Sequence, residues 1–311
     1  MTSDGAKRGV RTPKVTLHDG SVLELHVHGH GPTLLLPVNP HPVTGTQAES
    51  MRAVGADPEL GPALVDGLRD TVRVVAFDYE GHVMAAPKPD TLTPAAVAAD
   101  LLAVADAAGA DRFTYYGYSW LAMVGLQLAL RTDRLDALAM GGFPPLDGPY
   151  EAMLRVTTAT HELATSGGRP AGSAAPEPAQ PEPAESTGAG GAEGFDWDAA
   201  EVTLSAAQTR QFVTLYRALQ GFDDRSAQGR IRCPRLCFVG SVDEIPYGPR
   251  WGEVTVDITG PVVRHRAELA DLGWDVRVLD GLDHVRAMRA EHVLPVLRPW
   301  LTAVSGRRAG A

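Results

Sequence analysis

Residues 115–122 read YYGYSWLA and join a predicted strand to a predicted helix through one tight turn. The apolar run 113–116 is typical of a buried strand, and the apolar residues 119–130 are typical of a helix. A serine on such a turn projects its hydroxyl above the sheet. There the helix N-terminus and the Trp120 backbone N–H favour a developing negative charge. We therefore interpret Ser119 as a nucleophile; the alternative is a serine that only caps the helix.

Strand patterns and helical patterns alternate on both sides of this turn, which predicts an α/β fold with a mostly parallel, twisted sheet and helices on both faces. One helix is well delimited: Thr93 can cap it, Pro94 suits its first turn and Gly109 suits its end. A last helix is predicted over 285–304, kinked at its two prolines. The other predicted strands are an antiparallel pair within 14–30 with its turn at 18–21, and the runs 33–36, 72–77, 135–140, 235–239 and 274–279.

Residues 165–194 interrupt this alternation. They contain no large apolar side chain and consist mostly of Ala, Gly, Pro, Glu and Ser, which predicts disorder. The flanking stretches 150–164 and 205–220 are amphipathic, and the second begins with a capping box, Ser205 to Gln208. We expect a helical lid. The predicted organisation is a core in two parts, 1–148 and 221–311, with the lid at 149–220.

The turn at Ser119 resembles the nucleophile motif of the α/β-hydrolase family, G-x-S-x-G. Gly117 and Ser119 match the first two fixed positions, whereas Leu121 stands where the third glycine is expected. The resemblance covers nearly the whole chain outside the segment 165–194. Leu121 implies local repacking, for which Ala122 and Gly125 are the candidate sources of space.

The resemblance also implies a triad, because the family order is nucleophile, acid and then histidine. Asp243 follows the predicted strand 235–239, and His284 follows the predicted strand 274–279 in the loop before the last helix. A serine hydroxyl needs a base to take its proton, and the base needs an acid that orients it. Asp243 is the preferred acid; Glu244 and Asp147 remain alternatives.

The family places a second oxyanion donor after the strand 33–36, where this chain reads Pro-Val-Asn-Pro-His-Pro over 37–42. Proline has no N–H, so the donor falls to Val38 or Asn39, and we prefer Asn39, with Trp120 as the first donor.

Other side chains around the predicted site are candidate pocket residues. Tyr118 flanks Ser119, and Val38 lies beside Asn39. His82 belongs to residues 78–82, which resemble the family's D-x-R-G-H segment with Glu80 in place of the arginine. We expect Val38, Tyr118 and His82 to line a substrate pocket.

Composition excludes several other classes of function. The formal net charge is −10 with no basic stripe, which disfavours nucleic acid or an anionic membrane surface as a partner. No apolar run approaches the length of a membrane span. The N-terminus lacks the apolar core of a signal peptide, so a cytoplasmic location is expected. Cys233 and Cys237 are expected to be buried thiols. The alternating His26, His28 and His30 are expected to be strand residues and not metal ligands. No metal and no cofactor is expected.

Taken with the resemblance, these observations predict a serine hydrolase that acts on a carboxylic ester, thioester or lactone of a small molecule with a neutral or apolar acyl group. Two alternatives stay open. One is a cofactor-independent lyase or cyclase on the same fold, in which the histidine transfers a proton and Ser119 only positions the substrate. The other is a catalytically silent binding protein.

Overall fold

The computed structural model describes residues 13–166 and 203–309. Its centre is a seven-stranded sheet within those residues, in the order β11-β8-β7-β6-β4-β5-β3. Every neighbouring pair is parallel except β3 with β5, so the predicted mostly parallel sheet is confirmed. The strands are β3 (His26–His28), β4 (Thr33–Leu36), β5 (Arg73–Ala76), β6 (Phe113–Tyr118), β7 (Leu135–Gly141), β8 (Arg235–Gly240) and β11 (Trp274–Leu279).

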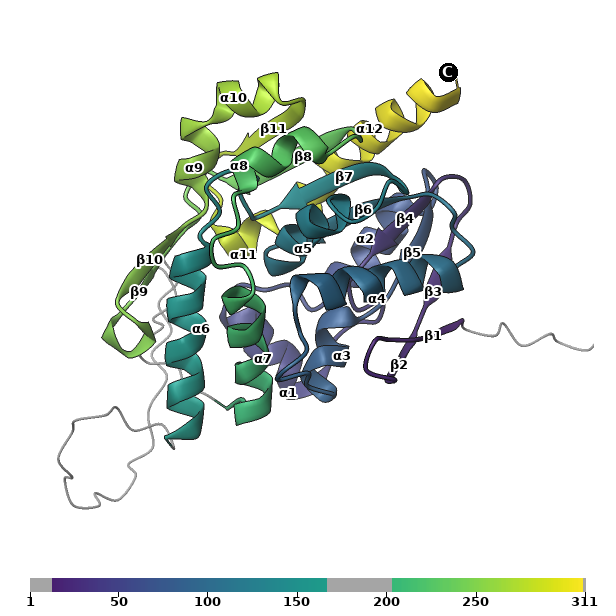
Figure 1. Cartoon of the computed structure of the whole chain (residues 1–311). Helices are drawn as coiled ribbons and strands as arrows, with labels where there is room; N and C mark the ends of the chain where they lie inside the picture. The colour runs from purple at the N-terminus through teal and green to yellow at the C-terminus, as the bar shows by residue number, and fades with distance from the viewer. Residues whose placement is uncertain (1–12, 167–202, 310–311) are drawn as a thin grey trace, which may run out of the picture.

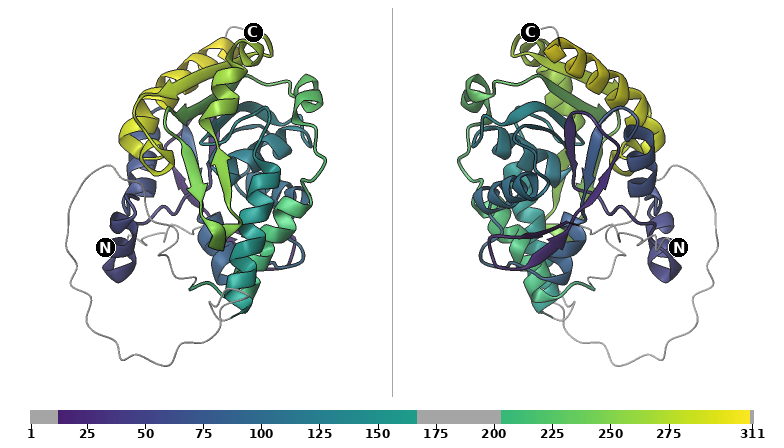
Figure 2. Two further views of the ribbon diagram at one scale, coloured as in Figure 1. Left: turned by 90° about the vertical axis from the view of Figure 1, so that its left-hand side faces the viewer. Right: turned by 90° about the vertical axis from the view of Figure 1, so that its right-hand side faces the viewer.

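Helices cover both faces of this sheet and bury one apolar core on each (Figures 1 and 2). One core includes α4 (Pro94–Ala107) and α5 (Trp120–Ala129), and the other includes α2 (Leu60–Leu68) and α12 (Ala290–Ala309). The remaining helices are α1 (Gly45–Ala53), α3 (Tyr79–Ala85), α6 (Tyr150–Thr165), α7 (Ala206–Arg217), α8 (Asp224–Ala227), α9 (Thr259–Arg264), α10 (Arg266–Asp271) and α11 (His284–Ala287), with 3-10 turns η2 (Gln228–Arg230) and η3 (Pro249–Trp251).

Several predicted helix ends, at both ends of α4 and at the start of α7, are present in the structure. The Thr93 hydroxyl accepts a hydrogen bond from the Ala96 N–H at 3.1 Å, and Gly109 takes a left-handed φ of 64° just after α4. The capping box at the start of α7 is also present: the Ser205 hydroxyl accepts from the Gln208 N–H, and the Gln208 side chain accepts from the Ser205 N–H. These are contacts within a few residues, so neighbouring sequence determines them.

Three features differ from the predictions or were absent from them. The last helix is broken into α11 and α12 at residues 288–289, whereas Pro295 and Pro299 lie inside α12. Residues 79–85 form α3, whose N-terminus is capped by the Asp78 carboxylate. Two short antiparallel pairs flank the main sheet: the predicted one, β1 (Lys14–Thr16) with β2 (Val22–Glu24), and an unpredicted hairpin of β9 (Glu244–Tyr247) and β10 (Val254–Asp257).

Two helices, α6 and α7, stand side by side between β7 and β8 in the chain, where the lid was predicted (Figure 1). Of the segment 165–194, only Thr165 and Ser166 are described, and they end α6; the rest lies outside the described residues, so its predicted disorder stays a prediction. The lid function and the domain boundaries also stay predictions. None of the described helices is both long and apolar enough to cross a membrane.

Candidate active site

The turn between β6 and α5 holds Ser119 in a conformation that side-chain-bearing residues rarely adopt, with φ 56° and ψ −130°. Such strain persists only where the surroundings enforce it. Here the Ser119 N–H donates to the Gly141 carbonyl at 2.8 Å. A Cβ at Gly117 would lie 2.4 Å from the Leu121 carbonyl oxygen, so only glycine permits the close turn. The turn leaves the Ser119 side chain partly exposed beyond the end of β6.

Leu121, the departure from the family motif, is buried in the core on the α4–α5 face. Gly125 and Ala122 were expected to give Leu121 its space, and this stays a prediction. A Cβ at Gly125 would lie 2.7 Å from the Tyr115 ring and 3.0 Å from Leu138, so that glycine makes room for these two side chains. The Tyr115 hydroxyl donates to the Leu121 carbonyl at 2.9 Å and joins the strand to the first turn of α5. Gly125 and Leu121 thus both lie against Tyr115, through its ring and its hydroxyl respectively.

Three predicted catalytic residues, far apart in the chain, meet at one edge of the sheet. The His284 Nε2 lies 3.0 Å from the Ser119 Oγ, and the His284 Nδ1 lies 2.9 Å from Oδ2 and 3.1 Å from Oδ1 of Asp243. The Asp243 side chain is fully buried, whereas that of His284 is 20% exposed. This arrangement can pass a proton from the hydroxyl to an imidazole that the buried carboxylate orients.

Asp243, the predicted acid, is held by a neighbour that the sequence did not indicate, Thr259 at the start of α9. The Asp243 N–H donates to the Thr259 hydroxyl oxygen at 3.0 Å, and the Thr259 hydroxyl donates to the Gly240 carbonyl at 2.6 Å. The N–H groups of Ile258 and Thr259 donate to the Asp243 carbonyl at 3.1 and 3.2 Å. The backbone of Asp243 is thus fixed independently of its carboxylate.

The histidine is held by Tyr118. Its hydroxyl donates to the His284 carbonyl at 2.7 Å, and the two ring centroids are 5.2 Å apart. Burial raises the pKa of Tyr118 well above its usual range, so the hydroxyl stays a donor. Tyr118 was predicted to line a pocket. Its observed contacts are with the histidine loop instead, and its part in a pocket stays a prediction.

The loop after β4, where the second oxyanion donor was predicted, lies at the same end of the sheet as Ser119. Leu34 and Leu35 of β4 pair in parallel with Thr114 and Tyr115 of β6, so the residues after β4 reach the same sheet edge as Ser119. The Val38 N–H already donates to the Leu36 carbonyl at 2.9 Å. The Asn39 side-chain oxygen accepts from the His41 N–H at 3.0 Å. These contacts favour the Asn39 backbone N–H over that of Val38.

The first donor is predicted to be Trp120. It is the first residue of α5, and the first N–H groups of an α-helix have no acceptor within the helix. Its backbone N–H is therefore available to a ligand beside Ser119.

Gly61 in α2 allows the Asn39 loop to take its position. A Cβ at this glycine would lie 1.7 Å from the Asn39 carbonyl oxygen, a backbone atom that cannot rotate away. We expect Gly61→Ala to shift the loop and lower kcat by about 10²-fold, because a displacement of this size misaligns an oxyanion donor. Gly306→Ala is the matched control, since Gly306 is also helical and a Cβ there meets nothing within 4 Å. Equal kcat values in the two variants would show that the Asn39 loop does not contribute to the site.

The two alternative acids lie elsewhere. The Asp147 Oδ2 is 2.6 Å from the His265 Nε2, and its Oδ1 is 3.3 Å from a guanidinium nitrogen of Arg225. Glu244 is exposed on β9, opposite Asp257 of β10. Of the three candidate carboxylates, only that of Asp243 is hydrogen-bonded to His284.

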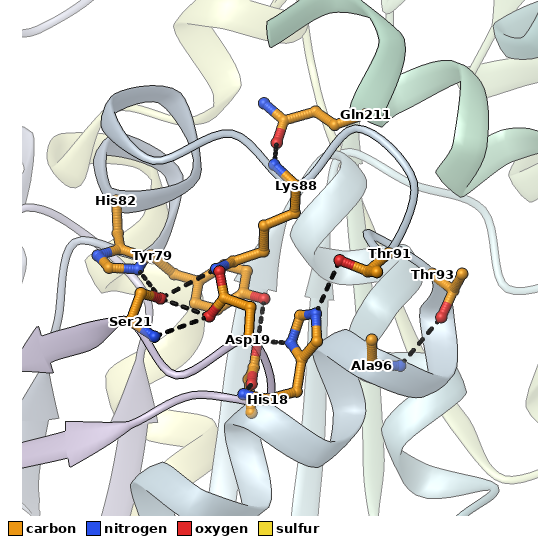
Figure 3. Close-up of polar contacts among 11 residues, drawn as sticks. His18, Asp19, Ser21, Tyr79, His82, Lys88, Thr91, Thr93, Ala96 and Gln211 are labelled. Carbon is orange, nitrogen blue, oxygen red and sulfur yellow. Dashed lines mark hydrogen bonds and ion pairs between the residues drawn. The ribbon is translucent and has the colours of Figure 1, made fainter. Parts of the chain in front are cut away.

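His82, another predicted pocket residue, belongs to a polar cluster between α3 and the N-terminal hairpin (Figure 3). Its Nε2 lies 2.8 Å from the Ser21 Oγ. The buried Lys88 ammonium forms an ion pair with Asp19 in the same cluster and donates to the Ser21 Oγ at 3.0 Å. The observed contacts of His82 are therefore structural, and a role in a pocket is only a prediction.

Several other histidines contact side chains away from Ser119. The His26 ring packs edge-on against His41 at 4.7 Å, and His28 lies two residues further along β3. His265 contacts Asp147 and Glu268, and His292 contacts Glu291. Over the described ranges, no group of three or more His, Cys, Asp or Glu side chains is arranged to hold a metal ion.

Comparison with known proteins agrees with this architecture. No protein-family model and no curated protein matches the sequence. Solved structures are similar over nearly the whole chain. A thermophilic esterase from Thermogutta terrifontis is 19% identical over 95% of this chain and 99% of its own, with a TM-score of 0.57. The enol-lactonase from Burkholderia xenovorans is 20% identical over 93% and 100%, with a TM-score of 0.56.

A carboxylesterase structure from Nitrososphaera gargenis is 17% identical over 95% of this chain and 100% of its own, with a TM-score of 0.60. At such identities the similarity establishes the fold alone. The central, mostly parallel sheet with helices on both faces has the same arrangement. The chain has the α/β-hydrolase fold.

Proposed function

We propose that this α/β-hydrolase-fold chain is a serine hydrolase that cleaves a carboxylic ester, thioester or lactone through an acyl-enzyme. One observation carries the proposal: the His284 imidazole is within hydrogen-bond distance of the Ser119 Oγ through one nitrogen and of the Asp243 carboxylate through the other. The similar structures include an esterase and an enol-lactonase, whose names indicate reactions at an acyl carbon.

The first half of the reaction acylates Ser119. The hydroxyl proton moves to the His284 Nε2 while the Oγ forms a bond to the substrate carbonyl carbon. The resulting oxyanion is stabilised by the backbone N–H groups of Trp120 and Asn39. When the intermediate collapses, the bond to the leaving oxygen or sulfur breaks, and His284 returns its proton to that atom.

The second half hydrolyses the acyl-enzyme. Water gives a proton to His284 as its oxygen attacks the acyl carbon, and the proton then passes to the Ser119 Oγ as the carboxylic acid leaves. Asp243 stays ionised throughout, holds the imidazole in one tautomer and stabilises its charged form.

We assign α7 to one wall of the acyl pocket. Phe212 of α7 packs edge-on against the Trp120 ring with centroids 5.5 Å apart. Helix α7 is tied to the segment after β5 by hydrogen bonds from the Gln208 side chain to the Met84 carbonyl and from the Thr214 hydroxyl to the Pro89 carbonyl, at 2.8 and 2.6 Å. Aromatic side chains at this wall suit a neutral or apolar acyl group. The pair α6 and α7 is thereby proposed as a lid over a small-molecule site.

A fluorophosphonate probe tests the proposal. An activated Ser119 displaces the fluoride and becomes phosphonylated, so we expect peptide mass spectrometry to find one adduct on the peptide that contains Ser119 and none in Ser119→Ala. Hydrolysis of 4-nitrophenyl esters of increasing acyl length then measures chain preference. A folded wild-type protein that neither reacts with the probe nor turns over any ester would exclude hydrolysis, leaving proton-transfer chemistry or ligand binding.

A further inference from the structure

The β9–β10 hairpin begins and ends at the proposed acid. Strand β9 starts at Glu244, the residue after Asp243, and β10 ends at Asp257, which pairs with Glu244 across the hairpin. The next two residues, Ile258 and Thr259, donate their N–H groups to the Asp243 carbonyl at 3.1 and 3.2 Å. Both ends of the hairpin therefore meet at Asp243, and its two paired strands extend from the acid as one arm.

This arm lies against helix α6 of the proposed lid. In Figures 1 and 2 the hairpin projects from the main sheet and runs beside α6. Val256 of β10 and Trp251 of η3 are only 1% and 6% exposed. Val256 belongs to the same buried core as Val156 of α6. The hairpin and the lid helix thus bury apolar side chains in one core.

One polar side chain of α6, that of Arg155, reaches the tip of the hairpin. Its guanidinium donates to the Gly252 carbonyl at 2.7 Å and to the Glu253 carbonyl at 3.4 Å. Both tip residues have a left-handed backbone, with φ values of 97° and 48°. For Glu253, which carries a side chain, this conformation is unfavourable and persists only where the surroundings enforce it. Arg155 therefore holds the shape of the tip as well as its place on α6.

We propose that Arg155 is a positioning residue for Asp243. Thr259 fastens the backbone of Asp243 to the main sheet, and the hairpin sets the direction in which Asp243 leaves that anchor. Because Arg155 holds the tip on α6, a shift of the lid helix passes along the hairpin to the carboxylate that orients His284. The position of the lid and the alignment of the triad are thereby coupled. This inference rests on the proposed function and adds a residue that governs its rate.

Arg155→Ala tests this coupling with a 4-nitrophenyl ester that the wild type hydrolyses. We expect kcat and kcat/KM to fall together by about 10-fold, because a misaligned acid weakens binding of the transition state and not of the substrate. Arg155→Lys keeps a cationic donor for the Gly252 carbonyl, so its kcat is expected to stay within about threefold of wild type. Arg298→Ala removes an exposed arginine from α12 and is the control, with kcat unchanged. A raised KM with normal kcat in Arg155→Ala would show that Arg155 only shapes the lid, and would overturn the proposal.

Gly252→Ala disturbs the same contact from the other side. The new Cβ would lie 3.4 Å from the Arg155 carbonyl oxygen, on a residue with left-handed φ, so we expect kcat to fall. Gly109→Ala is the matched control, since Gly109 is also left-handed and a Cβ there meets nothing within 4 Å. Residues that act through one contact are not additive, so the double variant of Arg155 and Gly252 should have a kcat little below that of the worse single variant. Losses that multiply in full would contradict a shared contact.

The hydrogen bond between His284 and Asp243 provides a measurement that does not depend on hydrolysis. The Nδ1 proton that the imidazole donates to the carboxylate resonates far downfield in the proton NMR spectrum, and its absence in His284→Ala assigns it. We expect this signal to move or weaken in Arg155→Ala and to stay unchanged in Arg298→Ala, at equal melting temperatures. An unchanged signal in Arg155→Ala, or a loss of folded protein that accounts for its lower rate, would overturn the coupling.

Probe labelling distinguishes failure of this inference from failure of the proposed function. If Ser119 reacts with the fluorophosphonate in the wild type and Arg155→Ala keeps the wild-type kcat, only the positioning role of Arg155 is overturned. If Ser119 does not react in a folded wild type, the proposed function fails, and the expected effect of Arg155 on its rate fails with it.

Discussion

Ser119→Ala and His284→Ala are each expected to lower kcat by about 10⁴- to 10⁶-fold, because residues that act as a unit lose most of their effect when any one is removed. The 3.0 Å contact between the Ser119 Oγ and the His284 Nε2 is the physical basis. Alanine at 119 removes the atom that attacks, and alanine at 284 removes the base. Single-turnover kinetics on an activated ester measures the loss.

The two losses should be similar, and the double variant should be little worse than either single variant. Neither change should alter the melting temperature greatly, since both side chains are partly exposed. A Ser119→Ala protein that keeps more than about a tenth of the wild-type rate while His284→Ala is inactive would contradict the acyl-enzyme and favour proton transfer by the histidine.

Asp243→Asn is expected to lower kcat by about 10⁴-fold while leaving the fold in place. Asparagine has nearly the same shape, and the backbone contacts of Asp243 with Thr259 do not involve the carboxylate. The amide, however, can donate to the His284 Nδ1. That hydrogen bond holds the ring proton on Nε2, which can then no longer accept the proton of Ser119.

Asp147→Asn is the matched control, because it makes the same chemical change in a carboxylate that contacts His265 and Arg225 on an exposed part of the surface. Exposed ion pairs contribute little to stability, so we expect less than about 1 kcal/mol of change and near-normal kcat. Activity assays and thermal melts of both variants test whether Asp243 or Asp147 is the acid. A larger loss of kcat in Asp147→Asn than in Asp243→Asn would reverse the assignment of the acid.

The sequence by itself determined the features that depend on neighbouring residues. The passage from strand to turn to helix around Ser119, the cap at Thr93 and the capping box at Ser205 were all predicted and are present. Apolar periodicity and side-chain caps act over a few residues, so they can be recognised without the rest of the chain. Through the family resemblance, the order of the nucleophile, acid and histidine motifs along the chain also indicated which residues to consider for the site.

Only the tertiary structure decided which of these residues meet. The sequence left three carboxylates as candidate acids, and the structure directs Asp243 to His284 and Asp147 to His265. It also turned Tyr118 toward the His284 carbonyl. These contacts join residues that lie 40 or more positions apart, as the separations of 41 for His284 with Asp243 and 166 for Tyr118 with His284 illustrate. Such contacts depend on how strands are ordered in the sheet and on how loops leave its edge, and no local pattern of side chains encodes either.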